Sequence, residues 1–146
     1  MNGLIGEYQH KLDTKFRMSL PSKIRATIGE SVIVTRGLDG CAYVYSQNDW
    51  NNITDQLRSL SLGNPQARSF NRFIMSSASA VDIDKAGRIL LPESLRNYAT
   101  LESEVVIAGV GNRLELWSPE NWAAQQELIT GNINDMAEKL SEVGMI

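Results

Sequence analysis

The sequence contains little of the chemistry from which metal sites and active sites are usually built. Its 146 residues include one cysteine, Cys41, and one histidine, His10. A single cysteine excludes an internal disulfide bond, and a zinc site needs three or four clustered ligands. Asp82 and Asp84 alternate along one segment, but no partner base, metal set or nucleophile accompanies them. We therefore predict a protein that is not an enzyme and that holds no metal ion and no cofactor.

Long hydrophobic runs are also missing. No apolar run approaches the ~18 residues of a membrane span, and no basic, apolar and small-residue signal opens the chain. We expect a cytoplasmic protein with no membrane partner and no small-molecule substrate.

Positive charge is scarce overall and unevenly distributed. The chain carries 14 Lys and Arg against 17 Asp and Glu, a formal net charge of -3, whereas nucleic-acid-binding domains are more often basic. Residues 1–73 hold nine basic and six acidic side chains, and residues 74–146 hold five basic and eleven acidic ones. Halves of opposite sign suggest that one half faces a polyanion. Drift of charge along the chain is an equally good explanation at this point.

The most informative feature is an internal repeat. Residues 12–25 and 83–96 carry the same residue at five positions at an offset of 71, and four more positions match at an offset of 72 after a one-residue insertion. The first five pairs are Asp13 and Asp84, Arg17 and Arg88, Leu20 and Leu91, Pro21 and Pro92, and Arg25 and Arg96. The other four are Val34 and Val106, Gly37 and Gly109, Ser46 and Ser118, and Trp50 and Trp122. Because chance seldom aligns so many specific residues, the sequence predicts a duplicated module.

Each copy has the same predicted elements. An Asp-x-x-x-Arg segment forms a turn between two strands, because Asp can accept hydrogen bonds from the backbone that follows it. A proline then opens a short helix, and two strands and a longer helix follow. The predicted strands are Arg17–Leu20, Ser31–Arg36 and Ala42–Tyr45, and Arg88–Leu91, Glu104–Ala108 and Leu114–Trp117, with turns at Gly37–Gly40 and Gly109–Asn112. The predicted helices are Pro21–Ala26, Asp49–Leu62, 65–78, Pro92–Ala99, Pro119–Ile129 and a weakly amphipathic Ile133–Val143.

These elements divide the chain into a first module at residues 3–62, a connecting helix at 63–80, a second module at 81–130, and a C-terminal helix or tail at 131–146. Four short strands leave exposed edges and too small a core to stand alone. We therefore expect the two modules to interleave their strands in one barrel-like unit.

The paired motifs Asp13–Arg17 and Asp84–Arg88, with Leu114–Trp122 behind the second, resemble the MraZ family of bacterial regulators. The resemblance implies a mainly β fold with flanking helices (α+β), a tandem-repeat, swapped-hairpin, double-ψ-like β-barrel of the AbrB/MraZ type. It also implies a homo-oligomeric ring that binds repeated promoter sites in double-stranded DNA. Those sites lie upstream of the cell-division and cell-wall gene cluster, and the protein would sit with the nucleoid.

The same resemblance suggests which residues contact DNA. The DNA-reading surface of the family is the first hairpin, which implies Asp13, Lys15 and Arg17 here. Local charge adds three more candidates, which are Lys11, Lys23 and Arg25. Asp84 and Arg88 are predicted to be the structural motif of the second repeat.

Two observations leave alternatives open. Phe16 stands where the second copy has Gly87, and phenylalanine does not take a positive φ cheaply. Either the first turn differs, or an exposed aromatic ring is accommodated near DNA. Arg17 could pair with Asp13 and stabilise only the hairpin, and Lys11 and Lys15 could be solvated side chains. The competing prediction is an interaction or assembly module that does not bind DNA, in which the acidic second half and the C-terminal helix would hold a partner protein.

Overall fold

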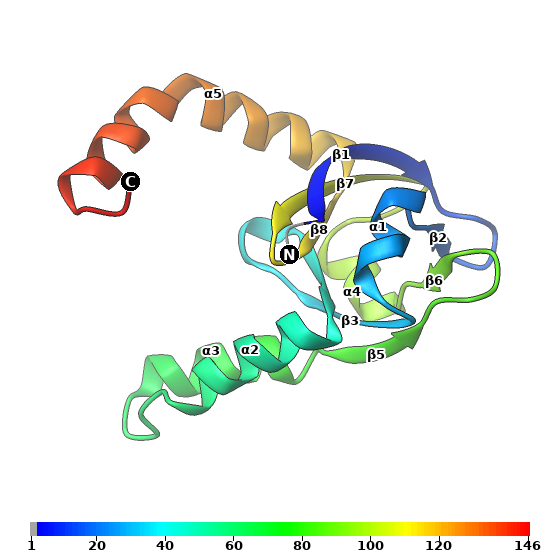
Figure 1. Cartoon of the computed structure of the whole chain (residues 1–146), viewed down its shortest axis with the longest axis horizontal. Coiled ribbons are helices and arrows are strands. Elements are labelled where there is room, and N and C mark those ends of the chain that lie inside the picture. The colour runs from blue at the N-terminus through cyan, green and yellow to red at the C-terminus, as the bar shows by residue number, and fades with distance from the viewer. Residues whose placement is uncertain (1–2) are drawn as a thin grey trace.

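The computed structural model, which describes residues 3–146, contains a six-stranded antiparallel sheet and a separate two-stranded ribbon (Figure 1). The strands are β1 (Leu4–Lys11), β2 (Arg17–Ser19), β3 (Ser31–Arg36), β4 (Ala42–Ser46), β5 (Ser79–Asp82), β6 (Arg88–Leu90), β7 (Glu104–Gly111) and β8 (Leu114–Trp117). The helices are α1 (Ser22–Ile28), α2 (Gln47–Arg58), α3 (Pro65–Met75), α4 (Glu93–Tyr98) and α5 (Pro119–Glu142), with a 3-10 turn at Leu38–Gly40. No helix among these residues is both long enough and apolar enough to cross a bilayer.

The two modules interleave, as their small size predicts. The sheet order is β1-β7-β8-β4-β3-β5, so β1 of the first module pairs with β7 of the second, and β5 of the second pairs with β3 of the first. The ribbon joins β2 to β6, with Met18 opposite Ile89. Strands of one module thus complete the sheet of the other, and the mainly β fold with flanking helices is confirmed.

Closure of the sheet into a barrel is not confirmed. β1 and β5 are the two edges of the six-stranded sheet, and no ladder joins them within residues 3–146. The ribbon of β2 and β6 lies over one face of the sheet in place of a hydrogen-bonded closure (Figure 1).

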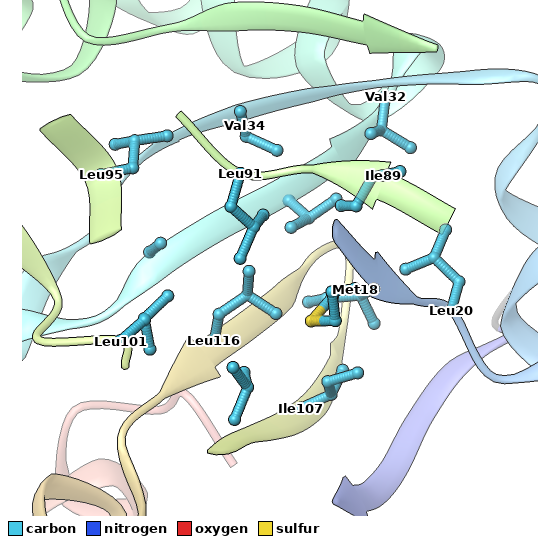
Figure 2. Close-up of a cluster of buried hydrophobic side chains, with 14 of the residues drawn as sticks. Met18, Leu20, Val32, Val34, Ile89, Leu91, Leu95, Leu101, Ile107 and Leu116 are labelled. Carbon is cyan, nitrogen blue, oxygen red and sulfur yellow. The ribbon is translucent and has the colours of Figure 1, made fainter. Parts of the chain in front are cut away.

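The main core lies between the sheet and the ribbon (Figure 2). Met18 and Ile89 of the ribbon are fully buried against sheet residues that include Ile107 and Leu116. Leu95 of α4 covers one end of this core. Burying side chains of this size contributes about 1.5–3 kcal/mol each, so this contact between the modules is a large part of the stability of the fold.

A second, aromatic cluster anchors the two long helices. The ring of Trp50 at the start of α2 lies 5.6 Å from that of Tyr45. The ring of Trp122 at the start of α5 lies 5.7 Å from that of Trp117. Both helix-start tryptophans are half-buried and pack against this cluster. Beyond these anchors α5 extends away from the sheet (Figure 1).

Several predicted boundaries are wrong: α2 ends at Arg58 where the sequence predicts Leu62, and α3 ends at Met75 where it predicts residue 78. Two further errors have a clear physical reason. α5 is one helix from Pro119 to Glu142, where the sequence predicts two helices with a break before Ile133. Gly131 lies inside α5, and an internal glycine costs only about 1 kcal/mol, which does not end a helix. β7 continues to Gly111 through the predicted turn, because β1 pairs with it along its whole length.

Candidate nucleic-acid interface

The two Asp-x-x-x-Arg turns lie at the same end of the molecule. One connects β1 to β2, the other connects β5 to β6, and the pairing of β2 with β6 brings them together (Figure 1). The free ends of α2, α3 and α5 point away from these turns, toward the other side of the molecule. The duplicated motif therefore forms one continuous surface, which we call the hairpin face: residues 13–17 and 84–88 with Arg25 and Arg96.

Asp13 builds the first turn through its own carboxylate. One oxygen, Oδ1, accepts hydrogen bonds from the backbone amides of Lys15 and Arg17, both at 2.9 Å. The other, Oδ2, accepts from Nε of Arg17 at 2.8 Å. The bond from the Arg17 amide holds the pKa of Asp13 below its ordinary value of 3.8, the Arg17 guanidinium acts in the same direction, and lost hydration opposes both. Asp13 is therefore charged and structurally engaged.

The second turn repeats this geometry. Asp84 accepts from the amides of Ala86 at 3.0 Å and Arg88 at 2.8 Å, and from Nε of Arg88 at 2.9 Å. The Arg88 amide bond lowers the pKa of Asp84 as well. Nη1 of Arg88 lies 3.7 Å from Oδ2 of Asp13, so the two motifs are also linked to each other.

Arg17 pairs with Asp13 in the structure. Its side chain is 30% exposed, and the ion pair uses Nε. The Nη groups of Arg17 make no hydrogen bond within residues 3–146. Stabilising the turn and contacting a ligand are thus compatible for this residue.

Phe16 adopts the backbone conformation of a glycine. Its φ is 62°, close to the 81° of Gly87 at the matching position. The two turns are therefore alike, and the idea that the first turn differs is wrong. The ring is 43% exposed, and Cζ of Arg96 lies 3.6 Å from its centroid.

Each turn is covered by an arginine from the other module. Arg96 of α4 stacks on Phe16, and Arg25 of α1 lies over Gly87. A Cβ atom at Gly87 would collide with the Arg25 guanidinium. The exposed Arg25 side chain could move aside, so the demand that Gly87 meets is the positive φ.

The other predicted basic residues are placed differently. Lys15 is exposed in the first turn, and Lys23 is exposed on α1. Lys11 is exposed at the end of β1, opposite Glu104 of β7. Lys15, Arg17 and Arg25 thus belong to the hairpin face, whereas Lys11 and Lys23 flank it.

Sequence reasoning missed two cations of the hairpin face, Lys85 and Arg96. Both come from the second half, whose net negative charge argued against a role in binding a polyanion. The repeat itself held the signal for Arg96, because it matches Arg25 at the same offset of 71. Within residues 3–146, no three His, Cys, Asp or Glu side chains are grouped as metal ligands.

Comparison with known proteins finds the same duplication. The family model described as "MraZ protein, putative antitoxin-like" matches residues 4–73 and again residues 74–141. The chain is 45% identical over 141 residues to the transcriptional regulator MraZ of Clostridium acetobutylicum, covering 97% of this chain and 99% of that protein. It is 43% identical over 136 residues to the transcriptional regulator MraZ of Natranaerobius thermophilus, covering 93% and 95%. The protein of the same name from Caldicellulosiruptor saccharolyticus is 44% identical over 142 residues, covering 97% and 99%.

Proposed function

The chain belongs to the MraZ family of transcriptional regulators, and on that premise we propose that it binds repeated promoter sites in double-stranded DNA through the hairpin face. The promoter is that of the bacterial cell-division and cell-wall gene cluster. The bound form is a homo-oligomeric ring, and the protein works in the cytoplasm at the nucleoid.

The observation that carries this proposal is the separation of charge between the hairpin face and helix α5. The hairpin face gathers Lys15, Lys85, Arg25 and Arg96, while its two aspartates are engaged by Arg17 and Arg88. Helix α5 carries five acidic side chains and one lysine, and it extends away from that face (Figure 1). A protein of net charge -3 can therefore present a cationic surface to a polyanion.

The side chains of the hairpin face suit DNA. Arginine can bind O6 and N7 of guanine in the major groove with two hydrogen bonds. Lysine neutralises phosphates and releases counterions, which gives affinity without sequence preference. A few cations per subunit bind weakly, and a ring that presents several copies to spaced repeats raises the effective concentration.

Helix α5 supports association between copies of the chain. Apolar residues recur at helical spacing and form a stripe along one side. They are Ile129, Ile133, Met136, Leu140 and Val143. Ile133, Leu140 and Val143 are exposed. The acidic residues of α5 lie off this stripe, so their charge does not oppose packing of another subunit against it. We propose that a second copy of the chain covers the stripe.

The test is DNA binding by fluorescence anisotropy at about 50 and 200 mM salt, with promoter DNA and a scrambled duplex. We expect specific, salt-sensitive binding by the wild-type protein. Lys15→Ala should weaken binding to both duplexes several-fold and reduce the salt slope by about one. It is a cleaner variant than Arg17→Ala, which would also break the turn.

The matched control is Lys139→Ala on α5, which removes an equally exposed lysine from the other side of the molecule and should bind DNA as the wild type does. Light scattering accompanies each measurement, and a mass of 16.2 kDa, that of one chain, would contradict the ring. No DNA binding by a folded oligomer would favour an interaction or assembly module instead.

A further inference from the structure

Arg96 is held on the hairpin face by two contacts. Its Cζ lies 3.6 Å from the centroid of the Phe16 ring, and its Nε donates a hydrogen bond to the carbonyl of Leu91 at 3.1 Å. The amide of Leu91 in turn donates to the carbonyl of Phe16 at 3.1 Å. The helix residue, the strand end and the opposite turn therefore form one small unit.

The outer nitrogens of Arg96 are available to a ligand. Within residues 3–146 they make no hydrogen bond, and Arg96 takes part in no ion pair. An aromatic ring covers the flat face of a guanidinium and leaves its in-plane donors free. The side chain is half-buried, so its position is set by the protein.

The other half of the repeat offers an internal comparison. Arg25 occupies the matching place over the second turn, but that turn has Gly87 and no ring. The Arg25 side chain is exposed and has no hydrogen bond within the described residues. Equivalent arginines thus stand at both turns, and only Arg96 is fixed by an aromatic side chain.

The left-handed backbone of Phe16 indicates a functional role for its ring. Left-handed backbone disfavours every residue that has a Cβ atom, and glycine is the usual solution. Strained residues of this kind persist where the surrounding structure holds them, and they gather at functional sites. Here the strained residue supplies the ring on which Arg96 rests.

We propose that Arg96 is a DNA-binding residue of the first turn and that Phe16 is the residue that positions it. The second module thereby provides a cation for the DNA-reading turn of the first. The ligand is an acceptor pair that fits a guanidinium fork, either two phosphate oxygens or O6 and N7 of a guanine. Fixing the side chain in advance reduces the rotamer entropy that binding would otherwise cost.

This inference rests on the proposed DNA-binding function, and the experiment separates the two. The variants are Arg96→Ala, Arg96→Lys, Phe16→Gly and the double variant of Phe16→Gly with Arg96→Ala. Arg72→Ala on α3 is the control, because Arg72 is exposed and lies outside the hairpin face. Each protein is titrated with promoter DNA at two salt concentrations, and its circular dichroism and oligomer mass are measured.

We expect Arg96→Ala to weaken specific binding roughly tenfold or more. Arg96→Lys should recover little of that loss. An ammonium group cannot donate the two parallel hydrogen bonds of a guanidinium group, and it does not stack on an aromatic ring as guanidinium does. Phe16→Gly should weaken binding several-fold in the wild-type background and have no effect in the Arg96→Ala background. This lack of additivity distinguishes positioning from a general loss of structure.

The salt slope and the base-pair preference identify the ligand. If Arg96→Ala lowers the slope by about one for every duplex, the ligand is a phosphate, and if it relaxes preference at one base pair, the ligand is a guanine. Either result supports the proposal. The proposal would be overturned if folded Arg96→Ala bound DNA with the affinity and salt slope of the wild-type protein while Lys15→Ala bound more weakly. That result would leave the proposed function standing. Absence of DNA binding by the wild-type protein would overturn both.

Discussion

At the scale of single residues, the Asp-x-x-x-Arg motif stabilises a turn through the side chain of its aspartate. In both modules the aspartate carboxylate accepts hydrogen bonds from two backbone amides and from Nε of an arginine. The carboxylate acts as a short piece of backbone that closes the loop. The motif thus builds the turn in both copies. The two turns differ at all three positions between the aspartate and the arginine, and the last of these, Phe16 or Gly87, carries the positive φ.

The lowered pKa values of Asp13 and Asp84 predict how stability depends on pH. A carboxylate whose folded pKa is depressed contributes stability above its unfolded pKa, and that contribution is lost as the pH falls through the folded pKa. The pKa values of both aspartates lie below 3.8. We therefore expect the wild-type protein to lose stability progressively below about pH 4. Asp84→Asn should melt at a lower temperature at pH 7 and lose less on acidification.

Thermal melts followed by circular dichroism from pH 7 to pH 3 would measure this difference. Asp82→Asn is the control, because the Asp82 side chain is exposed and makes no hydrogen bond within the described residues. A parallel decline of Asp84→Asn and wild type below pH 4 would show that the turn carboxylate is not a source of acid sensitivity.

At the scale of elements, the two long helices begin alike and end differently. The Ser46 hydroxyl caps α2 by accepting a hydrogen bond from the amide of Asp49 at 3.1 Å. The Ser118 hydroxyl caps α5 by accepting one from the amide of Asn121 at 3.1 Å. A turn at residues 59–64 then leads from α2 into α3, whereas α5 continues for 24 residues from Pro119 to Glu142. α5 buries no residue, so most of its length does not stabilise the folded monomer.

This difference predicts the effect of shortening α5. Ending the chain after Leu128 removes the whole apolar stripe and leaves the Trp122 anchor in place. We expect the melting temperature of the sheet to change by no more than a few degrees at equal protein concentration. The oligomer mass should fall toward that of one shortened chain, which is below the 16.2 kDa of the full chain. Light scattering and circular dichroism measure the two quantities, and an unchanged oligomer mass would show that another surface joins the subunits.

At the scale of the whole molecule, the two modules depend on each other. The ladders β1·β7, β3·β5, β4·β8 and β2·β6 all join one module to the other. Within a single module only β3·β4 and β7·β8 remain. Two strands without a covered face are at best marginally stable.

We therefore expect the fragment 1–73 to be unfolded alone and to fold when mixed with the fragment 74–146. The intact chain should unfold in one transition, with Trp50 fluorescence and Trp117 fluorescence reporting the same midpoint. Circular dichroism of the separate and mixed fragments is the direct measurement. A folded fragment, or two separated transitions of the intact chain, would show that the modules are independent.

Much of the local structure could be predicted from the sequence. The strands Ser31–Arg36 and Leu114–Trp117 match the structure at both ends, because β-branched and apolar residues alternate between clear turn signals. The duplication was visible because proline, tryptophan and charged residues recur at fixed offsets. The boundary errors fall where local signals are weak, at Gly109 in β7 and at Gly131 in α5.

The sequence by itself determined that two similar modules exist, where each turn forms and which residues are apolar, because these depend on contacts between near neighbours along the chain. Only the tertiary structure decided which strands pair, since either module could supply a partner for each edge. It also decided that Arg96 rests on Phe16, 80 positions earlier in the chain. The composition of the hairpin face follows from that long-range pairing, because the exchange of strands between modules brings an arginine from the acidic half to a turn of the basic half.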